Sequence, residues 1–134
     1  MIKIKNDPFS ILIQAFSELW PDKTCEIEFS NDIPQPTIND LDDRDFWFIE
    51  KNDIVRIGAA GATRFKNGEI PLILLNPDLE LSQIVDTLAE ELAHVAVGKE
   101  AGHGNMFEYA MDKLFIKFNE LAEGINNEEA TGNG

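Results

Sequence analysis

The residues best suited to chemistry lie between Glu90 and Phe107, in the segment EELAHVAVGKEAGHGNMF. Glu90 and His94 are four positions apart, so on a helix their side chains project from the same face. Glu91 lies about 100° further round such a helix, so its side chain points to one side of a group bound by Glu90 and His94. This spacing is that of a helix that binds a metal ion at positions i and i+4 and carries a proton-transferring glutamate between them.

A third metal ligand is predicted at His103. The glycines at 98, 102 and 104 predict that the helix ends at Gly98 and that the chain then reverses, which brings His103 to the start of the next helix. His94 and His103 are the only two histidines of the chain, and both fall at motif positions. Two histidines with one glutamate form an established catalytic zinc set. We therefore expect Glu90, His94 and His103 to bind a metal ion, with Glu91 as the general base.

The glutamate at position 90 leaves two interpretations open. As a ligand, Glu90 lowers the charge of the site relative to three histidines, which weakens polarisation of water and lets harder metals compete. Alternatively, Glu90 and His94 form a helical ion pair in its favoured orientation, worth roughly 0.2–0.5 kcal/mol, and no metal is needed. In the second case the protein keeps the fold and has lost the chemistry.

Several elements must position this segment. Asp7 is a predicted N-cap with Pro8 at the first helical position, and apolar residues recur at helical spacing until Pro21. From Thr24 to Ser30, apolar and acidic residues alternate as in a strand with one exposed face. A hairpin is predicted from the strands FWFIE and IVRI, joined by a turn at Lys51–Asp53.

The C-terminal half predicts one more strand and two helices. Ile70–Leu75 is a short apolar strand, and Pro71 places it at a sheet edge because proline donates no ladder hydrogen bond. Apolar residues then follow helical spacing up to Gly98, with Ser82 as the expected cap, and again from Gly104 or Asn105 to Gly124. We expect one domain over residues 1–124, with residues 125–134 as a disordered acidic and polar tail.

The motif and the order of elements resemble those of the SprT-like, or Spartan-type, zinc metallopeptidases of the zincin superfamily. Their pattern is H-E-x-x-H, a short loop, then a histidine followed by glycine and, three residues later, phenylalanine. His103, Gly104 and Phe107 match the second half, and the order of elements agrees over residues 7–123. The resemblance implies an α+β, zincin-like minimal metallopeptidase domain with an N-terminal helix, a small antiparallel sheet, an active-site helix and a closing helix.

Carried over residue by residue, the resemblance makes His94 and His103 zinc ligands, Glu91 the general base and Glu90 the replacement of the first histidine. The implied function is metal-dependent hydrolysis of peptide bonds by a metal-bound water that Glu91 activates. The substrate would be a protein or peptide that adds a strand to the edge of Ile70–Leu75. The zinc ribbon and the basic DNA-binding regions of some family members have no counterpart in this chain, which has one cysteine.

The charge of the chain indicates which partners to expect. Eleven basic and twenty-five acidic residues give a net charge of -14, and the basic residues are spread singly, which disfavours direct binding to nucleic acid. The alternative function is a catalytically inactive pseudo-metallopeptidase that acts as an acidic protein-binding module. Its loop Asp40–Asp45 would engage a basic partner or mimic nucleic acid. That loop lacks the glycine and the distant glutamate of an EF-hand, so we interpret it as a solvated acidic loop.

The location of the protein follows from simple features of composition. Cys25 is the only cysteine, so no internal disulfide forms, and we expect a packed thiol. No apolar run approaches the roughly 20 residues that span a bilayer. We therefore expect a cytoplasmic protein with no membrane segment.

Overall fold

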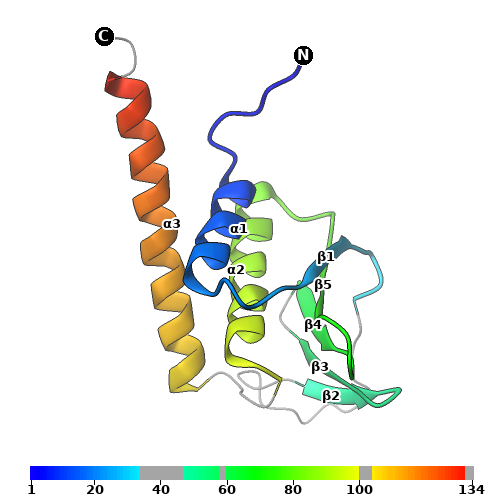
Figure 1. Ribbon diagram of the computed structural model, residues 1–134. Coiled ribbons are helices and arrows are strands. Elements are labelled where there is room, and N and C mark those ends of the chain that lie inside the picture. Colours follow the sequence, from blue (N-terminus) through cyan, green and yellow to red (C-terminus); the bar gives the residue numbers. More distant parts are fainter. Residues whose placement is uncertain (34–46, 58–59, 100–103, 132–134) are drawn as a thin grey trace.

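The computed structural model describes residues 1–33, 47–57, 60–99 and 104–131. It is an α+β fold with an N-terminal helix, a five-stranded mixed sheet and two C-terminal helices (Figure 1). His103 and the acidic loop Asp40–Asp45 lie outside the described residues. The elements are α1 (Pro8–Leu19), β1 (Glu26–Phe29), β2 (Trp47–Glu50), β3 (Asp53–Ile57), β4 (Gly61–Phe65), β5 (Leu72–Leu75), α2 (Leu81–Val97) and α3 (Asn105–Thr131).

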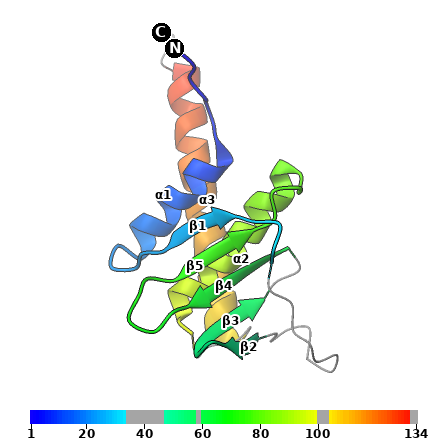
Figure 2. The same cartoon turned by 90° about the vertical axis from the view of Figure 1, so that its right-hand side faces the viewer.

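The sheet has the strand order β1-β5-β4-β3-β2, which Figure 2 shows face on. β1 pairs with β5 in parallel and the other pairs are antiparallel, so the predicted purely antiparallel sheet is wrong in this respect. The predicted edge position of Ile70–Leu75 is also wrong, because β5 lies between β1 and β4. Pro71 precedes the strand, and its carbonyl accepts a hydrogen bond from the Glu26 N–H, so the missing donor interrupts no ladder.

The hairpin of β2 and β3 is confirmed. Its turn residues Lys51 and Asn52 both have a positive φ, 51° and 69°, which matches the right-handed twist of the two strands. The next strand, β4, was not predicted. Gly61 opens this strand and pairs with Leu75 of β5.

Helix α1 forms as its sequence predicts. The Asp7 carboxylate accepts a hydrogen bond of 3.0 Å from the Phe9 N–H and one of 2.7 Å from the Ser10 hydroxyl, and Pro8 occupies the first turn. The buried face of the helix carries Leu12 and Phe16. Its polar cap therefore sets the start of the helix, and its apolar stripe sets which face turns inward.

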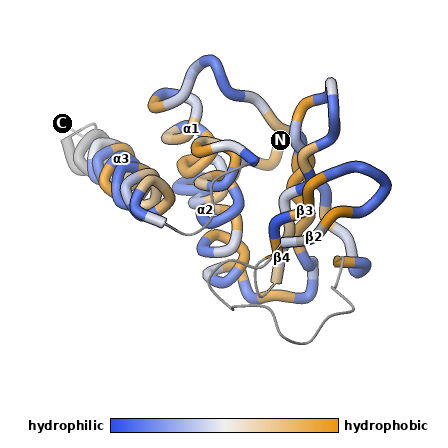
Figure 3. Tube along the Cα trace, turned by 90° about the horizontal axis from the view of Figure 1, so that it is seen from below, coloured by the Kyte–Doolittle hydropathy of each residue, from blue (hydrophilic) through white to orange (hydrophobic). Residues whose placement is uncertain are grey.

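Helix α2 is packed on two sides. It contacts β4 and β5 on one side and α1 and α3 on the other, and Figure 3 shows α1 and α2 between α3 and the sheet. The largest core cluster joins α1, β5, α2 and α3 through buried residues such as Leu12, Ile73, Leu88 and Leu114. A helix held on two sides is a rigid carrier for any side chain that projects from it.

Two helix boundaries differ from the predicted ones. Helix α2 has its N-cap at Glu80, and the Gln83 side chain accepts a hydrogen bond from the Glu80 N–H, so Ser82 is not the cap. Helix α3 continues past Gly124 to Thr131. A single glycine costs a helix only about 1 kcal/mol relative to alanine, which the neighbouring residues can offset. Among the described helices, none combines the length and the apolar composition that crossing a membrane requires.

Candidate functional site

The central turns of α2 carry three of the four predicted site residues. Glu90 is exposed, whereas Glu91 is fully buried and His94 retains only 2% of its surface. The helix therefore turns Glu91 inward, toward the sheet, and leaves Glu90 at the surface. This separation follows from the rotation of about 100° between consecutive helical residues.

Glu91 is bound to the sheet by a hydrogen bond. The Thr63 hydroxyl on β4 donates to Glu91 Oε2, and it lies 3.5 Å from the Glu91 main-chain oxygen. Burial raises the pKa of Glu91 to about 8; the Thr63 hydrogen bond lowers this pKa and the charge of Glu90 raises it. The carboxyl group is therefore largely protonated at neutral pH, in contrast to an exposed glutamate.

The second carboxyl oxygen of Glu91 has a different environment. Glu91 Oε1 is buried and forms no hydrogen bond with any described residue. A buried polar oxygen without a partner costs about 1–3 kcal/mol, so such atoms are rare in folded proteins and often belong to functional sites. Oε1 is thus the oxygen that carries the proton in the neutral acid, and it is the atom of Glu91 through which a proton can be released or taken up.

His94 lies on the same side of α2 as the first turn of α3. Its ring centroid is 4.8 Å from that of Phe107, with an angle of 39° between the ring planes. Phe107 is itself buried and packs with Ala93 and Ala110. The contact holds the imidazole against α3 and restricts its rotation, as a preorganised ligand requires.

Two of the three predicted metal ligands lie among the described residues. Glu90 and His94 are one turn apart on α2, as a pair of ligands must be, and His103 lies outside the described residues. Within residues 1–33, 47–57, 60–99 and 104–131, no three acidic, histidine or cysteine side chains form a group that could hold a metal ion. The described part of the chain thus supplies two of the three proposed ligands.

Arg56 connects the sheet to the end of α2. This buried side chain on β3 donates hydrogen bonds of 3.2 Å from Nε and 2.8 Å from Nη2 to the carbonyl oxygen of Lys99. Its guanidinium also lies over the Trp47 ring of β2, 5.6 Å from the centroid. Arg56 therefore fixes the position at which the chain leaves α2, just before the segment that contains His103.

Thr63 and Arg56 were missed by the sequence analysis. The sequence does indicate a role for Arg56, because it is the one charged residue within the otherwise apolar strand IVRI. A charged side chain in such a strand needs a partner when it is buried. Nothing in the sequence singles out Thr63, because its strand was not predicted and threonine is common in strands. The partner of Glu91 is visible only once β4 and α2 are packed together.

Comparisons with known proteins give no relative: no protein-family model, no curated protein and no solved structure matches this chain.

Proposed function

We propose that this chain is a metal-dependent peptidase domain with α2 as its active-site helix. In this proposal Glu90, His94 and His103 bind a zinc ion and Glu91 is the general base. The observation that carries it is the state of Glu91: a buried carboxyl group with a pKa of about 8 and one oxygen that makes no hydrogen bond with the described residues, beside a buried histidine. A carboxyl group that titrates near neutral pH is suited to accept and return a proton.

The donor set fits zinc in its chemistry, since imidazole nitrogens and a carboxylate oxygen are standard zinc ligands. A bound zinc ion would polarise the scissile carbonyl and a water molecule, and its charge would favour the ionised form of Glu91. Glu91 Oε1 would then take a proton from the attacking water and pass it to the leaving amine. The Thr63 hydroxyl would hold Oε2 and so keep Oε1 directed to the reaction.

The substrate in this proposal adds a strand to β2 rather than to β5. β2 is the last strand in the sheet order, so its outer side is unpaired in the described sheet. It also lies next to the end of α2, since Trp47 of β2 contacts Arg56, which binds Lys99. An extended peptide paired with β2 would therefore run beside the proposed site.

A second candidate function is a non-catalytic binding protein on the same scaffold. The observation that favours it is the complete burial of Glu91, whose carboxyl group exposes no surface to a substrate. In this case Thr63 and Glu91 form a structural hydrogen bond between sheet and helix, and Glu90 stays a surface residue. The acidic loop Asp40–Asp45, through which such a protein would bind a basic partner, lies outside the described residues.

Metal content and proteolysis separate the two functions. We expect purified protein to contain one zinc per chain by elemental analysis, and we expect His94→Ala and His103→Ala to lose it. Glu91→Gln should keep the zinc and lose cleavage of an unfolded, fluorescently labelled protein substrate, because the amide accepts no proton at neutral pH. The peptidase proposal would be overturned if the purified protein contained no zinc, were equally stable with and without EDTA, and did not cleave the substrate. A Glu90→His variant that gains zinc and activity absent from the parent would assign the parent to the second function.

A further inference from the structure

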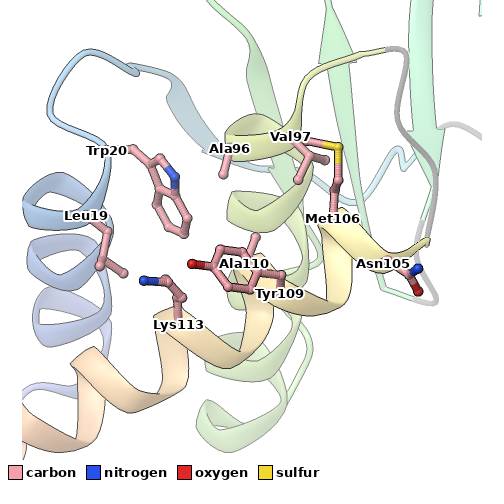
Figure 4. Close-up of a pocket in the computed structure, with 9 residues that line it drawn as sticks. All are labelled: Leu19, Trp20, Ala96, Val97, Asn105, Met106, Tyr109, Ala110 and Lys113. Carbon is pink, nitrogen blue, oxygen red and sulfur yellow. The ribbon is translucent and has the colours of Figure 1, made fainter.

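The end of α1, the end of α2 and the first turns of α3 enclose an apolar pocket, shown in Figure 4. Its volume is about 500 Å³, within the range of pockets that bind small molecules. Trp20 comes from the end of α1, Ala96 and Val97 from the last turn of α2, and Met106 and Tyr109 from α3. Met106 is 67% exposed, although it belongs to an apolar stripe of α3.

Polar groups lie at the margins of this pocket and not in its centre. Figure 4 shows the Lys113 amine and the Tyr109 hydroxyl on the side of α1, and Asn105 at the opposite end. The Lys113 nitrogen is 5.1 Å from the centre of the Tyr109 ring. Among the described residues, no carboxylate forms an ion pair with Lys113. None of the residues that line the pocket is acidic.

These features indicate the charge of a ligand. Within a chain of net charge -14, the pocket combines an apolar floor with a cation that has no acidic partner in the described structure. The negative charge of the protein repels anions at long range, but salt screens this repulsion beyond about 10 Å at 0.1 M. A ligand that buries an apolar body on Trp20 and places one anionic group on Lys113 therefore gains from both contacts.

We propose that this pocket binds small amphipathic carboxylates, with an aromatic or alkyl body against Trp20 and Met106 and the carboxylate on Lys113. Neither Glu90 nor His94 lines this pocket, and the proposal does not depend on a metal or on peptidase activity. Tyr109 supplies a wall for the apolar body and can donate its hydroxyl hydrogen to the carboxylate. Cationic ligands are disfavoured, because the pocket is lined by Lys113 and by no acidic residue.

The test uses three probes with one body: 4-phenylbutyrate, the neutral 4-phenylbutyramide and the cationic 4-phenylbutylamine. A Trp47→Phe background leaves Trp20 as the only tryptophan and thus as the fluorescence reporter. At 0.15 M salt we expect saturable changes in Trp20 emission with 4-phenylbutyrate, with a Kd on the order of 1 mM or below for a ligand of this size. The amide and the amine should bind roughly three- to tenfold more weakly.

Two substitutions that each remove one positive charge from α3 test the role of the Lys113 ammonium group. Lys113→Gln should remove the preference for the carboxylate, whereas Lys117→Gln should keep it. Lys117 lies on the same helix but is paired with Glu18 and Glu120 outside the pocket. Tyr109→Ala, at a residue 61% exposed, should weaken all three probes without changing the fold. Binding that is unsaturable, equal for the three probes, or equally affected by Lys113→Gln and Lys117→Gln would overturn the proposal.

Discussion

The Thr63 hydroxyl on β4 donates a hydrogen bond to Glu91 Oε2 on α2 and thereby joins the sheet to the helix in the interior of the protein. Both residues are fully buried. A single hydrogen bond, to one of the two carboxyl oxygens, does not compensate an ionised carboxylate for the loss of water, so burial favours the neutral acid. The proton on Glu91 is therefore part of the stability of the fold, and stability must depend on pH.

We expect the metal-free protein to lose stability as pH rises from about 5 to 8. The pKa of Glu91 is about 8 in the folded chain, against 4.5 for an unperturbed glutamate. Between these values the folded state holds a proton that the unfolded state has released, so the free energy of unfolding falls with rising pH. The slope from this group is at most about 1.4 kcal/mol per pH unit and ends above the folded pKa. Urea unfolding in the presence of EDTA at several pH values measures it.

Substitution at Glu91 provides the control for this dependence. Glu91→Gln keeps a similar shape and an acceptor for Thr63, but its side chain carries no titratable group. The free energy of unfolding of this variant should therefore lack the pH dependence that Glu91 gives the parent between pH 5 and 8. Glu90→Gln, at the exposed neighbour, should retain most of the slope, because the charge of Glu90 is the smallest of the three causes of the shift. Parallel curves for the parent and Glu91→Gln would show that the Glu91 pKa is not raised.

The role of Thr63 can be measured separately with two substitutions. Thr63→Val removes the donor and keeps the shape, so we expect a loss of about 1–3 kcal/mol in the free energy of unfolding. The loss should increase above about pH 8, because a hydrogen bond to the ionised carboxylate is the stronger one. Thr63→Ser keeps the hydroxyl and loses a methyl group, which costs about 0.8 kcal/mol. A Thr63→Ser variant as unstable as Thr63→Val would mean that packing, and not the hydrogen bond, is what matters.

The elements that the sequence predicted well are those set by local chemistry. Asp7 and Pro8 specify the start of α1 because a cap and a fixed φ act within one turn. The turn at Lys51 and Asn52 specifies the hairpin because it joins adjacent strands. The spacing of Glu90, Glu91 and His94 placed them on one helix, which the structure confirms as α2.

The features that the sequence did not predict depend on contacts between distant segments. Nothing within Ile70–Leu75 shows that β1 pairs with β5 in parallel, and Pro71 favoured a position at the edge of the sheet. Nothing local to Glu91 shows that it turns to Thr63, because the helix periodicity does not say which face meets which strand. The apolar stripe of α3 did not show that Met106 would border a pocket.

Arg56 leads to a prediction about the end of α2. Its two hydrogen bonds to the Lys99 carbonyl use the fork of the guanidinium, which a lysine ammonium cannot reproduce. Arg56→Lys should therefore destabilise the protein by about 1–3 kcal/mol. It should also speed hydrogen exchange of the Gly98 N–H, which closes the last turn of α2 on the His94 carbonyl. Hydrogen-exchange mass spectrometry of peptides that cover residues 94–99 measures this.

The matched control is the same substitution at Arg64. This side chain lies 2.8 Å from a Glu50 oxygen and 3.3 Å from an Asp53 oxygen, beside the hairpin of β2 and β3. Arg64→Lys preserves both charge attractions and should cost less than about 1 kcal/mol, with exchange at Gly98 unchanged. Equal exchange at Gly98 in the parent and in Arg56→Lys would show that Arg56 does not hold the end of the helix.

The close approach of β4 to α2 depends on Gly61. A Cβ atom at this position would lie 2.8 Å from Thr87 Cγ2 and 2.9 Å from the Leu74 carbonyl oxygen, and the second of these is strand backbone that cannot move alone. Gly61→Ala should therefore destabilise the protein by about 1–3 kcal/mol. Gly124→Ala is the opposite case: Gly124 sits within α3, and apart from the backbone of that helix and its chain neighbours no atom of the described residues lies within 4 Å of the added Cβ. That substitution should stabilise the protein by up to about 1 kcal/mol. Urea unfolding of the two variants beside the parent gives both signs, and a neutral Gly61→Ala would mean that β4 and α2 are less tightly packed than the structure shows.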